Sequence, residues 1–213
     1  MKRPRYIVVE GPIGVGKTSL AKSLAAEFHA RSVFEKVEEN PFLVKFYEDR
    51  ESYAFQAQIF FLLSRYQQQR ELIQQDLFNR NAVSDYLFAK DRIFAALNLS
   101  SEELALYKQL YQLLGPRVPK PDLVVYLQAR PDVLYKRVKK RDKTFDKEIT
   151  PEYLTEVARA YNEFFFRYDE SPLLTINTSD IDFIESSEDL ADLIKEINTM
   201  GSGTQHYIPL GSR

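Results

Sequence analysis

The sequence has no cysteine and only two histidines, His29 and His206. Without cysteine the chain can form neither a disulfide framework nor a cysteine-based zinc site. Two histidines leave little scope for imidazole catalysis. No apolar run reaches the ~20 residues that a membrane-spanning helix needs. We therefore expect a cytoplasmic protein with no membrane partner.

The chain also has no large excess of positive or negative charge. The formal net charge is −2, from 29 basic and 31 acidic residues, so electrostatics give no reason to expect a nucleic-acid polymer as partner. The length of 213 residues fits one α/β domain with a substantial core. We expect a single domain over residues 1–200 and a loosely held, Gly- and Ser-rich tail over residues 201–213.

The segment GPIGVGKT, residues 11–18, is the strongest functional signal in the chain. It matches the phosphate-loop pattern GxxxxGK[ST], whose glycines let backbone N–H groups point at phosphate oxygens. A β-branched run precedes it and a helical pattern follows it, which predicts an anion site at a helix N-terminus. Lys17 is expected to reach the terminal phosphates of ATP, and Thr18 to ligate Mg²⁺. The predicted ATP-binding residues here are Gly11, Pro12, Ile13, Gly14, Val15, Gly16, Lys17, Thr18 and Ser19.

Strand and helix patterns alternate along the rest of the chain. Further strands are predicted over residues 32–37, 81–85, 121–127 and 173–177. Helices are predicted over residues 19–28, 42–49, 53–75, 100–114, 130–141, 151–165 and 187–200, the one at 100–114 with a capping signal in Ser100-Ser-Glu-Glu. This alternation predicts an α/β fold with a doubly wound parallel sheet of about five strands, and ligands at the carboxyl ends of the strands.

Several short motifs follow the phosphate loop in a fixed order: ENPF at 39–42, FYED at 46–49, FQAQIFFLLSR at 55–65, SDYLFAKDR at 84–92 and RVKKRDK at 137–143. Together, from about residue 6 to residue 190, they resemble the deoxynucleoside kinase family. Its members move the γ-phosphate of ATP onto the 5′-hydroxyl of a deoxynucleoside. The chain has no NKxD guanine signature, which argues against a GTPase.

The resemblance implies three contacts with the sugar of the nucleoside. Glu39 corresponds to the family's acid near the 5′-hydroxyl, and Glu38 takes its place if the register differs by one residue. Tyr47 corresponds to the sugar-binding tyrosine. Asp146 occupies the position of an acid that accepts from the 3′-hydroxyl, where glutamate is usual in the family.

The resemblance also implies the residues that read the base. Gln58 lies eleven residues after Tyr47, as the family's base-reading glutamine does, and this spacing favours it over Gln56. Arg65 and Asp91 resemble the pair found in members that act on deoxyadenosine, deoxyguanosine or deoxycytidine. A rigid polar pair would exclude the methyl group of thymidine; the alternative is an ordinary salt bridge.

Asp85 is the expected general base, because it follows a predicted strand and corresponds to the family's catalytic acid. Its alternative role is to hold Mg²⁺ through water. The sequence departs from the common family pattern at the next position, where Tyr86 stands in place of arginine. This form is similar to a bacterial branch of the family, and it puts the phosphate contact of that arginine in doubt.

An arginine-bearing lid is expected over residues 137–150. Arg137 and Arg141 lie one helical turn apart and could close over the transferring phosphoryl group. The family's third lid arginine is a lysine here, Lys143. Asp182 and Phe183 match a family loop that holds the ATP adenine.

Two rival functions remain open at this stage. A nucleoside monophosphate kinase shares the phosphate loop and the lid, but it needs further arginines for the phosphate of the acceptor. A non-catalytic nucleotide-binding subunit would keep the fold without a reason to keep the loop, the acid and the lid together. The resemblance also implies a homodimer, with the helix over residues 53–75 and the aromatic segment 161–168 as candidate faces, although both could be core.

Overall fold

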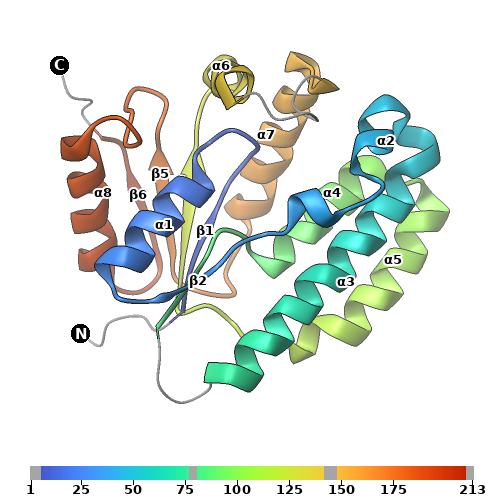
Figure 1. Ribbon diagram of the computed structural model, residues 1–213, viewed down its shortest axis with the longest axis horizontal. Helices are drawn as coiled ribbons and strands as arrows, with labels where there is room; N and C mark the ends of the chain where they lie inside the picture. Colours follow the sequence, from blue (N-terminus) through green and yellow to red (C-terminus); the bar gives the residue numbers. More distant parts are fainter. Residues whose placement is uncertain (1–5, 77–80, 142–147, 210–213) are drawn as a thin grey trace.

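The computed structural model describes residues 6–76, 81–141 and 148–209. Six parallel strands form one sheet in the order β2-β3-β1-β4-β5-β6 (Figure 1). The strands are β1 (Tyr6–Glu10), β2 (Arg31–Val33), β3 (Ala82–Ser84), β4 (Leu123–Gln128), β5 (Leu173–Asn177) and β6 (Thr204–Tyr207). The predicted α/β class and the doubly wound parallel sheet are confirmed.

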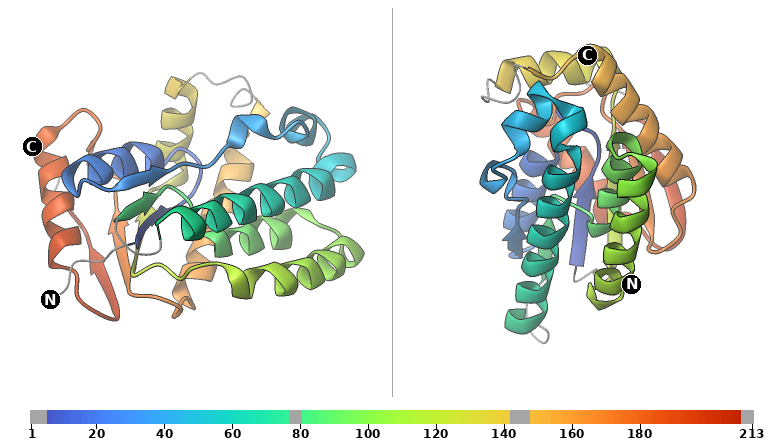
Figure 2. Two further views of the ribbon diagram at one scale, coloured as in Figure 1. Left: turned by 60° about the horizontal axis from the view of Figure 1, so that its bottom comes forward. Right: turned by 90° about the vertical axis from the view of Figure 1, so that its right-hand side faces the viewer.

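Helices cover both sides of this sheet. In Figure 1, α8 lies to the left of the strands, α1 is drawn across them, and α3, α4 and α5 lie to the right. The left view of Figure 2 shows α3, α4 and α5 packed side by side. The α-helices are α1 (Lys17–Glu27), α2 (Leu43–Glu48), α3 (Arg50–Asp76), α4 (Asp91–Asn98), α5 (Ser101–Leu114), α6 (Pro131–Arg141), α7 (Pro151–Phe166) and α8 (Ser187–Thr199). Short 3₁₀ turns are η1 (Val37–Glu39), η2 (Phe88–Lys90) and η3 (Gly115–Arg117).

The two central strands, β1 and β4, are apolar along their length because both faces are covered by helices. Val8 pairs with Val124 and Val9 with Val125, and all four side chains are fully buried. The chain places β3 on one side of β1 and β4 on the other. This change of direction leaves a crevice beyond the carboxyl end of β1, which is where open α/β sheets bind ligands.

The predicted capping signal at the start of α5 is confirmed. The Ser100 hydroxyl accepts from Glu103 N, and the Glu103 carboxylate accepts from Ser100 N. Such a cap stabilises a helix by about 1 kcal/mol. It fixes the start of the helix that brings Tyr107 to the site.

The expectation of a loosely held tail after Gly201 is wrong for residues 204–207. Thr204–Tyr207 forms β6, which pairs in parallel with β5 from Leu173 to Ile176, and the sheet has six strands rather than about five. The residues of β6 are mostly exposed, so no apolar alternation marks the strand in the sequence. The short helix α4 was also not predicted.

The described helices contain no candidate membrane span: within residues 6–76, 81–141 and 148–209, no helix combines the length and the apolar content that a bilayer crossing needs.

Candidate active site

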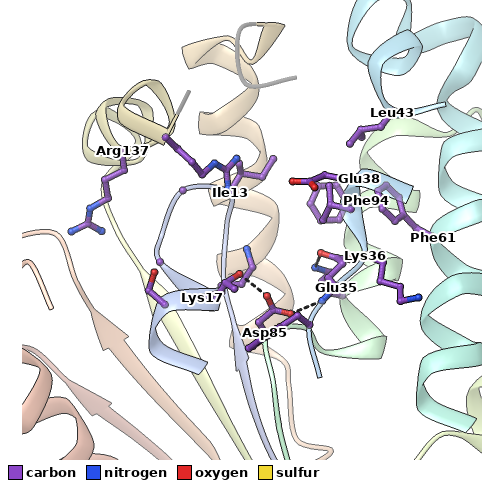
Figure 3. Close-up of a pocket in the computed structure, with 18 of the residues that line it drawn as sticks. Ile13, Lys17, Glu35, Lys36, Glu38, Leu43, Phe61, Asp85, Phe94 and Arg137 are labelled. Carbon is purple, nitrogen blue, oxygen red and sulfur yellow. Dashed lines mark hydrogen bonds and ion pairs between the residues drawn. The ribbon is translucent and has the colours of Figure 1, made fainter. Parts of the chain in front are cut away.

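A cavity of about 740 Å³ lies beyond the carboxyl ends of β1, β2 and β3 (Figure 3). The phosphate loop lines one end of it through Gly14, Gly16 and Lys17. Residues of α3, with α2 and α7, line the other end. The cavity therefore joins an anion-binding loop to a pocket with apolar and aromatic walls.

The phosphate loop requires glycine at positions 14 and 16. Their φ angles are +84° and +101°, values that residues with a side chain rarely adopt. A Cβ on Gly16 would lie 2.6 Å from Cζ of Phe183, and one on Gly14 would lie 2.7 Å from Cγ2 of Val138. The loop is thus packed tightly against Phe183 and against α6. Phe183 is buried, and its contact with the ATP adenine stays a prediction.

Lys17 folds back over this loop. Its Nζ donates to the carbonyl oxygens of Gly11 at 2.7 Å and Pro12 at 3.2 Å. Burial, and after it the charge of Lys90, lowers the pKa of Lys17 to about 8, although nearby carboxylates act in the opposite direction. Lys17 is therefore a cation at neutral pH in a site that disfavours positive charge until an anion is present.

Asp85 connects the phosphate loop to the segment after β2. One oxygen accepts from the Thr18 hydroxyl at 2.5 Å, and the other accepts from Glu35 N at 2.7 Å (Figure 3). Asp85 follows β3 directly and is buried. The structure thus brings together Thr18 and Asp85, the two residues predicted as Mg²⁺ ligands, so that their side-chain oxygens are in contact.

Glu35 is the acidic residue that the sequence analysis missed. Arg65 donates to its Oε1 from Nε at 2.6 Å, and the Lys90 ammonium donates to its Oε2 at 2.7 Å. Burial alone would raise the pKa of Glu35, but the charges of Arg65 and Lys90 outweigh burial and hold it at about 2. Glu35 is a fixed, ionised carboxylate on the wall of the cavity.

Glu39, the acid predicted from the ENPF motif, lies in an exposed turn. Glu39 is in η1, pairs with Lys36 at 3.1 Å and has 58% of its side chain exposed. Both Glu38 and Glu39 belong to the rim of the cavity. The position of β2 explains the difference: the strand ends at Val33, earlier than predicted, so the first acid after it is Glu35.

The base-reading candidates meet on α3 and α4. Gln58 is buried in the cavity wall, whereas Gln56 is exposed, and Gln58 Nε2 donates to the carbonyl oxygen of Asp91 at 3.0 Å. Arg65 Nη1 pairs with Asp91 Oδ1, and the Tyr107 hydroxyl donates to Asp91 Oδ2 at 2.9 Å. Asp91 is fully buried behind Arg65 and Gln58, so it orients these two side chains from behind. Tyr107 was not predicted.

Of the two other residues predicted to contact the sugar, the structure describes Tyr47. Tyr47 lines the cavity, and its ring meets the ring of Tyr153 edge-on with centroids 6.2 Å apart. Asp146 lies outside the described residues. The predicted lid is described only as far as Arg141 and again from Glu148.

The two predicted lid arginines differ in their surroundings. Arg137 donates to the carbonyl oxygens of Thr178 and Ile181, both at 2.9 Å, and Figure 3 shows it directed away from Asp85 and Glu35. Burial lowers the pKa of Arg137 from its ordinary value. Arg141 is exposed and lies at the rim of the same cavity. Asp182 also lines the cavity, and its carboxylate accepts from Ile184 N at 3.2 Å.

Glu10 is a second acid that the sequence analysis missed. It ends β1 just before the phosphate loop and is fully buried. Its carboxylate accepts from Gly11 N at 2.9 Å, Leu87 N at 2.6 Å and the Tyr161 hydroxyl at 3.1 Å. An acid at the end of a continuous apolar strand is the signal that could have found it, because such a carboxylate needs dedicated donors.

The donor set suits Mg²⁺. Thr18 and Asp85 offer oxygen atoms, which this ion prefers, and Mg²⁺ is commonly held by one or two protein ligands together with substrate phosphates and water. Across the three described ranges, no cluster of three or more His, Cys, Asp or Glu side chains could form a larger metal cage.

A phosphate loop, a strand-end acid beside its threonine and an adjoining nucleoside-sized cavity define a nucleotide-dependent phosphotransferase. Comparison with known proteins agrees. The family model described as deoxynucleoside kinase matches residues 7–201. The chain therefore belongs to the deoxynucleoside kinase family, which consists of ATP-dependent phosphotransferases.

Individual relatives cover nearly the whole chain. The chain is 36% identical over 205 residues to the deoxyguanosine kinase of Bacillus subtilis, covering 92% of this chain and 99% of that protein. It is 36% identical over 198 residues to the deoxyadenosine kinase of Dictyostelium discoideum, covering 89% and 78%. A solved deoxyadenosine kinase from M. mycoides with bound dATP matches with a TM-score of 0.77 at 21% identity, covering 92% of this chain and 100% of that one, which shows the shared fold.

Proposed function

We propose that this kinase transfers the γ-phosphate of ATP to the 5′-hydroxyl of purine deoxynucleosides and deoxycytidine in preference to thymidine. One observation carries the proposal: Glu35 touches both Asp85, beside the phosphate loop, and Arg65, beside the base-reading glutamine. The donor end and the acceptor end of the cavity therefore meet at one residue, whose backbone N–H donates to Asp85 and whose carboxylate accepts from Arg65. The names of the relatives support the choice of acceptor, since they include deoxyguanosine and deoxyadenosine kinases.

At the donor end, the loop amides and Lys17 bind the phosphates of ATP. Thr18 and Asp85 would hold Mg²⁺, which when bound neutralises charge on the phosphate oxygens. Both oxygens of Asp85 already accept hydrogen bonds, from Thr18 and from Glu35 N, so its position is fixed before the substrates arrive. Asp85 is better placed for this role than for the role of general base.

At the transfer point, Glu35 accepts the proton of the 5′-hydroxyl. Arg65 holds Oε1 with two nitrogens, Nε at 2.6 Å and Nη2 at 2.5 Å, whereas Lys90 holds Oε2 with one contact at 2.7 Å. Oε2 therefore retains a lone pair for a hydroxyl. Its low pKa makes it a weak base, and this suits a loose transition state in which the proton leaves late. Its main contribution is then to orient the attacking oxygen.

At the acceptor end, Gln58 presents its Oε1 to the base, because its Nε2 is bound to Asp91 O. An amide oxygen accepts from the exocyclic amine of adenine or cytosine. Arg65 forms a rigid neighbouring wall, locked by Glu35 and Asp91. We propose that this wall excludes the methyl group of thymine, and that Tyr47 contacts the sugar.

The rival nucleoside monophosphate kinase is less well supported by these contacts. An acceptor phosphate needs free cationic groups. Arg65, the arginine at the acceptor end of the cavity, is already paired with two buried carboxylates. We propose that Arg137 and Arg141 act on the donor side, with Arg137 leaving its carbonyl partners when the lid closes.

We also propose that the protein forms a homodimer through the outer faces of α3 and α5. These packed helices carry large exposed leucines: Leu63 is 51%, Leu106 48% and Leu113 66% exposed. The buried core of a homodimer interface is more apolar than the rest of a protein surface. Sedimentation analysis of the wild type and of Leu113→Glu tests this: a dimer that dissociates in the variant supports it, and a wild-type monomer at all concentrations contradicts it.

The proposed roles are tested by measuring ADP formation from ATP with and without deoxynucleoside. We expect ADP release to depend on deoxynucleoside, and Glu35→Gln to lower kcat by about 10²–10⁴-fold, the range for a proton acceptor. ADP release at the same rate with and without deoxynucleoside would contradict the proposed kinase function. A fully active Glu35→Gln protein would contradict the role of Glu35 alone.

A further inference from the structure

Lys90 is a buried cation of the cavity to which the sequence motifs assign no task. It lies in η2 with 2% of its surface exposed, and it is one of the residues that line the cavity. Its ammonium is 2.7 Å from Glu35 Oε2 and 4.0 Å from Glu10 Oε2. Because burying an ammonium is costly, it persists only where carboxylates compensate it.

Position 86 cannot supply this charge. Tyr86 stands where the common family pattern has arginine, and its side chain is fully buried in a cluster with Val33, Leu72 and Ala82. Its hydroxyl accepts from Gln69 at 3.1 Å. This position therefore points into the core and away from the cavity.

The same segment offers a cation at a different place. Residues 84–92 are all described, and their basic side chains are Lys90 and Arg92. Arg92 is half exposed and lies 3.6 Å from Glu170 on the outer surface. Of the two, Lys90 lines the cavity, four residues after position 86.

The contacts of Lys90 determine the geometry of Glu35. Arg65 holds Oε1 and Lys90 holds Oε2, so the plane of the carboxylate is set by two cations on different elements, α3 and η2.

We propose that Lys90 is a positioning residue of this kinase, which fixes the Glu35 carboxylate toward the 5′-hydroxyl and supplies the buried positive charge that position 86 lacks. The inference rests on the proposed role of Glu35. With Lys90 removed, Oε2 loses its partner and the carboxylate can rotate about its bond to Cγ. ATP binding at the phosphate loop does not depend on this contact.

Steady-state kinetics of Lys90→Met tests the proposal, with Lys195→Met on the exposed face of α8 as the matched control. We expect kcat to fall about 10²-fold, with KM for the deoxynucleoside and Kd for ATP within about 3-fold of wild type. In the background of Glu35→Gln, Lys90→Met should cost nothing further, because it acts through Glu35. The control should keep wild-type kcat.

Lys90→Arg covers the case in which Lys90→Met does not fold. A folded Lys90→Arg protein keeps the charge and should retain at least about a tenth of wild-type kcat. A folded Lys90→Met protein with wild-type kcat, a folded Lys90→Arg protein as inactive as Glu35→Gln, or a full further loss in the double variant would each overturn the inference. A wild-type protein that phosphorylates no deoxynucleoside would instead overturn the proposed function, which separates the two failures.

Discussion

The hydroxyl of Thr18, in the first turn of α1, donates to Asp85 at the end of β3 over 2.5 Å. The two residues are far apart in the sequence and meet because β1 and β3 are neighbours in the sheet. The pair places two oxygen ligands beside the phosphate loop, where Mg²⁺ would bind with the phosphates of ATP.

Asp85→Asn should therefore weaken the response to Mg²⁺. One carboxylate ligand becomes a neutral amide, so we expect kcat to fall by at least about 10²-fold and the Mg²⁺ concentration for half-maximal rate to rise. Initial rates across a Mg²⁺ titration measure both. Asp132→Asn, at an exposed position on α6, is the matched control. A variant with the Mg²⁺ curve of the wild type would show that Asp85 does not hold the metal.

Gly16→Ala should abolish tight ATP binding. The new Cβ would meet Phe183 Cζ at 2.6 Å, at a φ of +101°, so the loop must move. Gly203→Ala is the matched control, because its φ is +75° and no atom lies within 4 Å of the added Cβ. We expect each protein to lose about 1–2 kcal/mol of stability from the backbone conformation, and Gly16→Ala alone to lose ATP affinity in calorimetric titration. Equal ATP affinity in both would argue against the tight packing.

Tyr107→Phe should affect the nucleoside side and spare the ATP side. It removes one of the donors to the buried Asp91 carboxylate, whose loss costs about 1–3 kcal/mol. Because this carboxylate orients Arg65, we expect KM for the deoxynucleoside to rise about 5–10-fold while KM for ATP stays constant. Tyr111→Phe, in the same aromatic cluster, serves as control. A shift in the ATP constant instead would indicate general disruption.

Acid should destabilise the metal-free protein partly through Glu35. Its pKa falls from 4.5 to about 2 on folding, so the stabilisation is complete above about pH 4.5 and is lost as the pH drops toward 2. The full effect is on the order of 3 kcal/mol. Urea unfolding with EDTA at pH 5, 4 and 3 should show a steeper loss in the wild type than in Glu35→Gln. Equal losses of stability in the two proteins would mean that folding does not lower the pKa of Glu35.

The sequence was sufficient to predict most of the fold and the position of the phosphate loop between β1 and α1. The phosphate loop, the capping box of Ser100 and Glu103 and the apolar run of β4 are local patterns whose physics does not depend on distant residues. Glu35 was not predicted, because the end of β2 decides which acid lies next to Asp85, and the sequence marks strand ends poorly. The burial of Asp91 behind Arg65 and the contacts of Arg137 with Thr178 depend on packing between distant segments. The exposed edge strand β6 has no apolar pattern to detect.

The assay that tests the central claim most directly compares kcat/KM for deoxyadenosine, deoxyguanosine, deoxycytidine and thymidine with ATP as donor, with the product identified as the 5′-monophosphate. We expect deoxyadenosine, deoxyguanosine or deoxycytidine to be the best acceptor and thymidine the poorest, by at least about 10-fold, since Arg65 and Gln58 form a rigid polar wall. Thymidine as the best acceptor, or no 5′-monophosphate from any of the four, would contradict it.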